Sequence, residues 1–93
     1  MNEERIVRKH MDIYGRVQGV GFRYSACYAA SDLGLTGWVR NRWDGSVEME
    51  VQGTEERIRE LLGMLNRGRF ISIEKIEEKT IPIVSKETKF KIR

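Results

Sequence analysis

Gly15, Gly19 and Gly21 stand close together where an alternating, strand-like pattern changes to a helical one. Glycine adopts positive φ without strain and lets the backbone approach a ligand closely. A helix is predicted from Phe22, and the first N–H groups of a helix have no intrahelical partner. A loop of this kind favours phosphate or carboxylate, and the guanidinium of Arg23 can bind two oxygens at once. The segment therefore predicts an anion site, most simply for a phosphoryl group.

The hydrophobic pattern changes between strand-like and helix-like stretches along the chain. The expected elements, in order, are a strand over 7–14, the glycine loop over 15–21, a helix from 22 to a stop at Gly34, strands over 36–41 and 46–52, a helix over 55–65, and strands over 70–76 and 90–92. The period slips before Ile76, which indicates a bulge. The order predicts an α+β fold: a ferredoxin-like βαββαβ sandwich with two helices packed on one face of an antiparallel sheet, and a short extra strand at the C-terminus.

Length and composition favour one domain over residues 1–93, of which 40% are hydrophobic. No apolar run approaches the ~18 residues that cross a bilayer, and the charged N-terminus lacks the apolar stretch of a signal peptide. The lone cysteine, Cys27, cannot form an internal disulfide, which favours a reducing compartment and predicts a cytoplasmic protein. The net charge of +3 favours small anionic ligands but is too weak and too evenly spread to indicate nucleic acid. We expect no membrane association and a monomer.

These residues together resemble the acylphosphatase family. Its phosphate-loop motif is matched by Gly15-Arg16-Val17-Gln18-Gly19-Val20-Gly21-Phe22-Arg23. A second block is Gly34-Leu35-Thr36-Gly37-Trp38-Val39-Arg40-Asn41, followed by Asp44-Gly45 and Gln52-Gly53. The blocks stand in family order and at family separations. The resemblance implies a hydrolase that cleaves the carboxyl–phosphate bond of small acyl phosphates, such as acetyl phosphate or 1,3-bisphosphoglycerate, with no metal, no cofactor and no covalent intermediate.

The resemblance also assigns roles to single residues. The arginine that matches Arg23 binds the phosphate in this family, and the asparagine that matches Asn41 orients the attacking water. The other expected phosphate contacts are mainly backbone groups of Gly15, Arg16, Val17, Gln18, Gly19, Val20, Gly21 and Phe22. Inorganic phosphate or sulfate is expected to compete with substrate. Trp43 in the hairpin and Arg69-Phe70 after the second helix depart from the family pattern, so we expect them to affect the substrate tail, partner contacts or stability.

The residues suit this chemistry on their own terms. A carboxylate leaving group, with a pKa of ~4, needs no general acid, so the reaction mainly requires a held phosphoryl group and a placed water. Asn41 carries both a donor and an acceptor with which to orient a water. No strong base lies near these blocks, which suggests that the substrate's own phosphate takes the proton. His10 is interpreted as a strand-face residue, and His10 and Cys27 give no credible metal cluster.

Several alternatives stay open at this point. The glycine loop could be only a tight turn, and Asn41 only a hairpin residue. Nucleotide binding is disfavoured because no Lys-Ser or Lys-Thr follows Gly21 and the spacing fails the dinucleotide fingerprint. A non-catalytic anion- or RNA-binding module shares the fold class, although no RNP1 motif is present. Arg16, Arg40 and Arg42 are either solvated or anion-steering charges, and the lysines near the C-terminus are most simply a solvated strand face.

Overall fold

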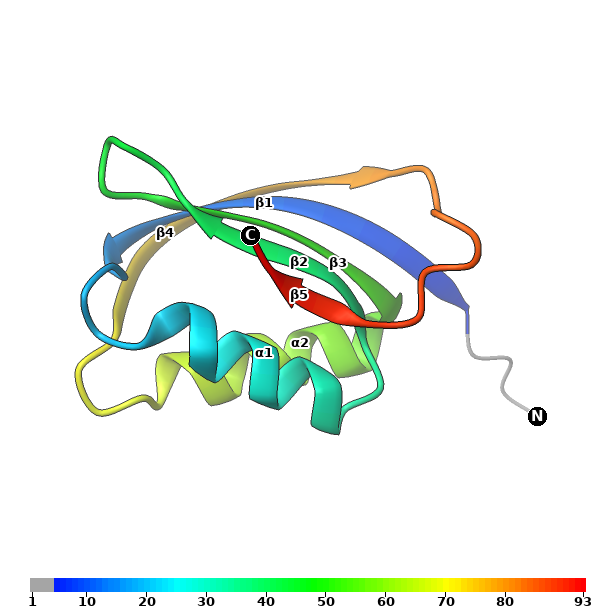
Figure 1. The fold of residues 1–93 in the computed structure, drawn as a ribbon, viewed down its shortest axis with the longest axis horizontal. Coiled ribbons are helices and arrows are strands. Elements are labelled where there is room, and N and C mark those ends of the chain that lie inside the picture. The colour runs from blue at the N-terminus through cyan, green and yellow to red at the C-terminus, as the bar shows by residue number, and fades with distance from the viewer. Residues whose placement is uncertain (1–4) are drawn as a thin grey trace.

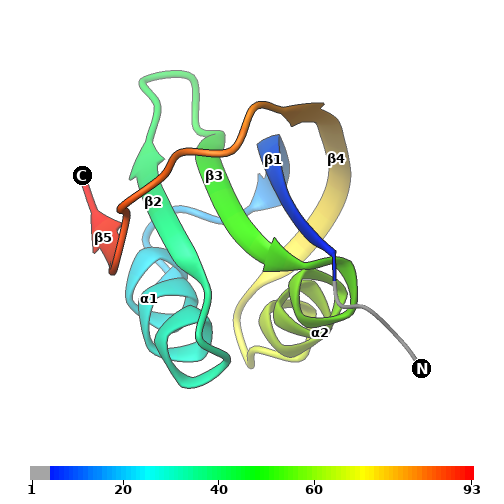
Figure 2. The same cartoon turned by 90° about the vertical axis from the view of Figure 1, so that its right-hand side faces the viewer.

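The computed structural model describes residues 5–93 and shows one sheet with two helices on one of its faces (Figures 1 and 2). Its elements, in chain order, are β1 (Ile6–Arg16), α1 (Phe22–Asp32), β2 (Thr36–Asn41), β3 (Val47–Thr54), α2 (Glu55–Asn66), β4 (Ser72–Ile81) and β5 (Phe90–Ile92). This is the predicted ferredoxin-like order, followed by the predicted short last strand. Neither helix is long and apolar enough to cross a membrane among the residues described.

The strands lie in the order β4-β1-β3-β2-β5. The pairs β1–β3, β1–β4 and β2–β3 are antiparallel, whereas β5 joins the edge of β2 in parallel. The short last strand therefore makes the sheet mixed rather than purely antiparallel. Because β1 and β2 are both antiparallel to β3, they run in the same direction, and the last residues of both strands come to the same end of the sheet.

The core lies between the helices and the inner face of the sheet. Strand alternation directs Met11, Ile13, Met49 and Val51 inward, and each is fully buried. Small alanines on α1 and leucines on α2 pack against these side chains. The buried helical residues are Phe22, Ala26, Ala29, Ala30, Ile58, Leu61 and Leu65. Full burial of a large apolar side chain contributes roughly 1.5–3 kcal/mol, so this layer holds the helices on the sheet.

The two helices end as their sequences predict but begin differently. After α1, the N–H of Leu35 donates to the carbonyl oxygen of Ala30 at 2.8 Å, which places Gly34 in the turn that stops the helix. At the start of α2, the Thr54 side chain accepts a hydrogen bond from Arg57 N at 3.2 Å, and Glu55 and Glu56 occupy the first turn. The N-cap of α1 is Gly21, which gives no side-chain hydrogen bond, and the first turn of α1 contains no acidic residue.

The bounds of β1, β3 and β4 differ from the predicted ones, and β1 and β4 differ most at their ends. The first strand continues through Arg16, because Gly15 and Arg16 pair with β4 opposite Ile73 and Ser72. The fourth strand is Ser72–Ile81, where the pattern predicted 70–76. Residues 77–80 are exposed on an edge strand that pairs only with β1. Their side chains therefore show no alternation of apolar and polar residues from which the backbone pairing could be predicted.

The predicted slip before Ile76 is confirmed as a bulge. Tyr14 pairs with Lys75 and Gly15 with Ile73, which leaves Glu74 without a partner on β1. At Gly15 the φ is 133°, and a Cβ would lie 2.1 Å from the carbonyl oxygen of Ser72. The first glycine of the motif is therefore required by the close approach of two strands.

The outer face of the sheet is polar, but it is not simply solvated. Arg8 is 1% exposed and pairs with Glu50 at 2.9 Å and with Glu87 at 2.7 Å. Trp38 is only 9% exposed, because the guanidinium of Arg93 lies 4.3 Å from the centre of its ring. The Arg8–Glu87 pair fastens the segment that precedes β5 onto the sheet, and Arg93 fastens the residue that follows β5.

Candidate functional site

The loop between β1 and α1 places an open backbone surface at the start of a helix. Gly19 and Gly21 have φ of 73° and 77°, and a Cβ at either position would meet nothing within 4 Å. These glycines are thus required by backbone conformation and not by lack of space. Successive N–H groups in such a loop converge on one side and form an anion-binding concavity. Because α1 has no side-chain cap, its first N–H groups remain available to an external anion.

Apolar residues anchor this loop between its glycines. Val17 is 1% exposed and Phe22 is 2% exposed, and Val20 packs against the same core. Buried anchors on both sides of Gly19 and Gly21 hold the loop in one shape. Of the eight residues predicted to form the phosphate loop, Gly15 and Arg16 belong to β1 and Phe22 to α1, so the loop itself is residues 17–21.

Gln18 joins the loop to the hairpin between β2 and β3. Its Nε2 donates to the carbonyl oxygen of Arg42 at 2.6 Å and to that of Ser46 at 2.8 Å. The hairpin is closed by Arg42 N, which donates to Ser46 O at 2.9 Å. Sequence reasoning had predicted mainly backbone roles for the loop, and it missed this side chain. The available signal was an amide among glycines and valines, but its partners lie 24 and 28 residues away.

Asn41 is the last residue of β2, directly before the hairpin that Gln18 holds. It pairs with Val47 of β3 and shares the helix-facing side of the strand with the fully buried Val39. Its Oδ1 is buried and has no hydrogen-bond partner among residues 5–93. A buried acceptor left unpaired costs about 1–3 kcal/mol, so this oxygen is suited to accept a hydrogen bond from a bound water or ligand.

Arg23 is the second residue of α1 and is half-buried. Within the described part of the chain, its guanidinium forms no ion pair with a carboxylate. The cation therefore stands beside the uncapped helix start with its charge uncompensated. Arg23 and the loop thus come from adjacent residues, and Gln18 brings the loop to the hairpin that follows Asn41.

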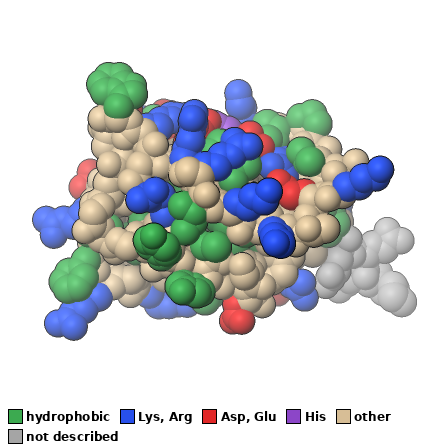
Figure 3. Space-filling model, in the orientation of Figure 1, with side chains coloured by type: hydrophobic (Ala, Val, Ile, Leu, Met, Phe, Trp, Pro, Cys, Tyr) green, Lys and Arg blue, Asp and Glu red, His purple; other side chains and the backbone are tan. Residues whose placement is uncertain are grey.

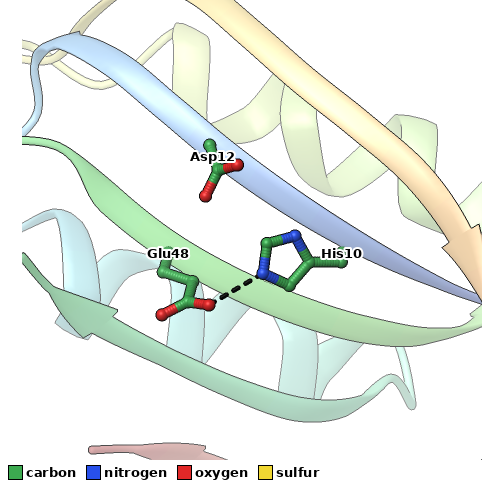
Figure 4. A group of neighbouring side chains, drawn as sticks. All are labelled: His10, Asp12 and Glu48. Atoms are coloured by element: carbon green, nitrogen blue, oxygen red, sulfur yellow. Dashed lines mark hydrogen bonds and ion pairs between the residues drawn. The ribbon is translucent and has the colours of Figure 1, made fainter.

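An ion-pair network lies on the other face of the sheet, behind the hairpin. Figure 4 shows His10 Nε2 directed at a Glu48 oxygen, 2.8 Å away, with Asp12 beside them. Arg42 completes the group: its Nη1 lies 2.8 Å from Asp12 and its Nη2 lies 3.0 Å from Glu48. The ligand atoms of His10, Asp12 and Glu48 lie within 4.8 Å of one another, a spacing that sequence reasoning did not foresee because the residues come from two strands. The Arg42 guanidinium already bridges both carboxylates, so this cluster is an ion-pair network whose cation is an arginine.

The same network determines the charge state of Glu48. Burial raises the pKa of this carboxyl, but hydrogen bonds from His10, Arg40 and Arg42 outweigh it and lower the pKa to about 2. Glu48 is therefore ionised throughout the neutral range and keeps Arg42, the residue after Asn41, in a fixed position.

Acid titration should reveal this contribution to stability. The pKa of Glu48 is lower in the folded state than its ordinary 4.5, so the stabilisation is complete above that value and is lost as the pH falls toward 2. The shift corresponds to roughly 3 kcal/mol. We expect the difference in unfolding free energy between wild type and Glu48→Gln, from urea titrations, to be larger at pH 6 than at pH 2. Glu60→Gln, at an exposed position on α2, is the control. An equal difference at both pH values would contradict the assignment.

Comparison with known proteins gives a consistent picture. A family model for acylphosphatase matches residues 9–92. The acylphosphatase of Thermococcus kodakarensis is 53% identical over 62 residues, which cover 67% of this chain and 68% of that protein. The acylphosphatase of Clostridium beijerinckii is 38% identical over 89 residues, covering 95% and 99%. The crystal structure of acylphosphatase from Bacillus subtilis has a TM-score of 0.84 at 32% identity, covering 94% of this chain and 98% of that one.

Proposed function

The chain belongs to the acylphosphatase family, and from that premise we propose that Arg23, the loop over residues 17–21 and Asn41 together hydrolyse small acyl phosphates. The observation that carries this assignment is that unpaired positive charge and an unpaired buried acceptor lie at the same end of the sheet. The start of α1 and Arg23 present positive charge without an anion, and Asn41 Oδ1 is a buried acceptor without a donor among residues 5–93. A bound phosphoryl group supplies the anion, and a water molecule supplies the hydrogen-bond donor.

The phosphoryl group is bound by main-chain and guanidinium donors. N–H groups of the loop and of the first turn of α1 surround its oxygens, and Arg23 pairs with two of them. Phosphoryl transfer is catalysed mainly by positioning and by stabilising charge on the equatorial oxygens. Because Val17 and Phe22 anchor the loop in the core, these donors are in place before the substrate arrives.

Asn41 orients the water that attacks the phosphorus. Its Oδ1 accepts a hydrogen bond from the water, which lines the water's oxygen up opposite the breaking P–O bond. As the new P–O bond forms, the bond to the acyl oxygen breaks and the carboxylate leaves with the electron pair. The proton of the water passes to a phosphate oxygen, so the products are a carboxylate and inorganic phosphate. The carboxylate requires no proton from the enzyme at neutral pH.

Hydrolysis of acetyl phosphate in the presence of a chelator tests the assignment most directly. We expect the rate to be unchanged by EDTA, since Arg23 supplies the positive charge and the leaving group needs no Lewis acid. Inorganic phosphate or sulfate should inhibit competitively by occupying the same donors. Loss of activity on metal removal, or inhibition that is not competitive with acetyl phosphate, would contradict the proposal.

Gln18 offers a test of the coupling between loop and hairpin. Gln18→Ala removes both hydrogen bonds to the hairpin, so we expect kcat/KM for acetyl phosphate to fall by about tenfold through misplacement of Asn41. Gln52 is a matched control because its amide also bonds a distant backbone, at Val84, but on the outer face. Gln52→Ala should lower the melting temperature to a similar extent and leave kcat/KM unchanged. Equal losses of activity in both variants would show that Gln18 acts through stability alone.

We also propose a cytoplasmic location, where acyl phosphates are generated by metabolism. The single cysteine supports this: Cys27 is half-buried beside the core and donates to the carbonyl oxygen of Phe90 at 3.5 Å. A thiol used for packing and left unpaired is typical of a reducing compartment.

A further inference from the structure

A hollow of about 310 Å³ lies on the outer face of the sheet, beside β5. Gly37 and Trp38 of β2 line one side of it, and the segment from Lys86 to Arg93 lines the rest. Four cationic side chains surround the hollow: Lys86, Lys89, Lys91 and Arg93. Figure 3 shows basic side chains gathered over β5 and the segment that leads into it.

The positive charges around this hollow lack ion-pair partners in the described part of the chain. None of the four side chains forms an ion pair with a carboxylate within residues 5–93. On the same face, by contrast, Arg8, Arg40 and Arg42 each lie within 3.0 Å of a carboxylate oxygen. Four cations without an ion-pair partner therefore lie together around the hollow.

Glu87 is the carboxylate that lines the hollow, and it is held by another residue. Arg8 donates to its two oxygens at 2.7 and 3.3 Å, and Arg8 is 1% exposed. Burial raises the pKa of Glu87, but hydrogen bonds from Arg8 and Thr36, together with the charges of Arg8 and Lys91, outweigh it and hold the pKa below its usual value. This ion pair fixes the loop, and within residues 5–93 none of the four cations forms an ion pair with Glu87.

Backbone hydrogen bonds hold the segment that carries the cations against β2. Gly37 N donates to Lys89 O at 3.1 Å, and Arg93 N donates to Val39 O at 2.9 Å. Phe90 is buried and Ile92 half-buried on the helix side, so Lys89, Lys91 and Arg93 alternate onto the outer face. Alternate residues of a strand lie roughly 6.6 Å apart, so these three present charge over about 13 Å. A ligand that uses all three must carry several negative charges in a row.

We propose that this hollow is a second anion site, which binds linear condensed phosphates such as tripolyphosphate. Three of its four cations are ammonium groups, which bind phosphate oxygens as point charges and do not recognise a particular nucleic-acid base. Binding of single-stranded nucleic acid uses exposed aromatic rings on which bases stack, whereas the ring of Trp38 is covered by Arg93. The hollow is separate from the phosphate loop, because Trp38 faces the outer side of the sheet and Asn41 faces the helices.

Titration calorimetry with tripolyphosphate tests the site through a matched pair of variants. Lys89→Gln with Lys91→Gln should weaken binding by about tenfold, because two charge-assisted contacts are lost. Lys75→Gln with Lys79→Gln removes the same charge from β4, at the other edge of the sheet, and should leave the affinity close to that of wild type. If both double variants bound tripolyphosphate equally weakly, the loss would depend on net charge alone, and the proposal would be overturned.

Chemical-shift mapping on the wild-type protein locates the ligand without any substitution. Tripolyphosphate should shift the amide signals of Gly37, Thr88 and Lys91 and the indole signal of Trp38. Shifts confined to residues 15–23 would place the anion at the phosphate loop only and overturn the second site. A single-stranded RNA of equal charge that binds the same residues more tightly would replace condensed phosphate with nucleic acid. The double variant Lys89→Gln with Lys91→Gln should keep wild-type kcat/KM for acetyl phosphate, which separates this inference from the proposed catalytic function.

Discussion

Replacing Arg23 by methionine is expected to lower kcat/KM for acetyl phosphate by about 10³- to 10⁵-fold, the range measured for arginines that stabilise phosphoryl transfer. The guanidinium stands at the start of α1, beside loop N–H groups that carry only partial charge. Without the guanidinium, no full positive charge faces the negative phosphoryl oxygens, either in the bound substrate or in the transition state. The affinity for inorganic phosphate should therefore fall together with activity.

Steady-state phosphate release and calorimetry with inorganic phosphate check the two losses separately. Arg23→Lys keeps the charge but not the planar pair of donors, so it should recover part of the phosphate affinity and little of the rate. Arg59→Met removes an exposed arginine from α2 and should leave both measurements unchanged. A variant at position 23 that binds phosphate as tightly as wild type would show that the loop N–H groups alone form the anion site.

Asn41→Ala is expected to lower kcat by about 10²- to 10³-fold, the usual effect of removing one preorganised polar group from a transition state. Asn41 lies at the end of β2 and contributes no charge, so phosphate should bind nearly as well as before. The loss should thus appear in kcat, with little change in the inhibition constant of inorganic phosphate.

The inhibition constant distinguishes Asn41 from Arg23. Wild type, Asn41→Ala and Asn66→Ala are compared in one assay, the last being an exposed asparagine at the end of α2. Asn66→Ala should behave as wild type in both rate and inhibition. If Asn41→Ala lost phosphate affinity in proportion to rate, Asn41 would be a phosphate ligand and the water would need another partner.

Features written in local sequence were predictable. The glycine loop, the Thr54 cap, the Gly34 stop and the alternation in β3 each depend on residues that are near one another in the chain. The place of Asn41 followed in the same way, since the strand pattern ends shortly before Asp44-Gly45, a pair typical of tight turns between strands. The family likeness added the roles of Arg23 and Asn41, which no local pattern assigns and which the proposed experiments test.

Features that depend on pairing between distant segments were not predictable. The extent of β4 comes from its ladder with β1, 56 to 73 residues earlier, and its exposed side chains carry no strand pattern. The Gln18 bridge and the grouping of His10, Asp12 and Glu48 also depend on register across strands. Arg42 could be read from sequence as a solvated charge, whereas in the fold it joins two carboxylates behind the hairpin.

The buried oxygen of Asn41 separates the stability of the protein from its turnover. Asn41 Oδ1 has no protein donor among residues 5–93, so through this atom the side chain adds no hydrogen bond between protein groups to the fold. Asn41→Ala should therefore resist urea about as well as wild type while catalysing far less. The hydrogen-bonding capacity of this oxygen is thus reserved for solvent and substrate at this end of the sheet.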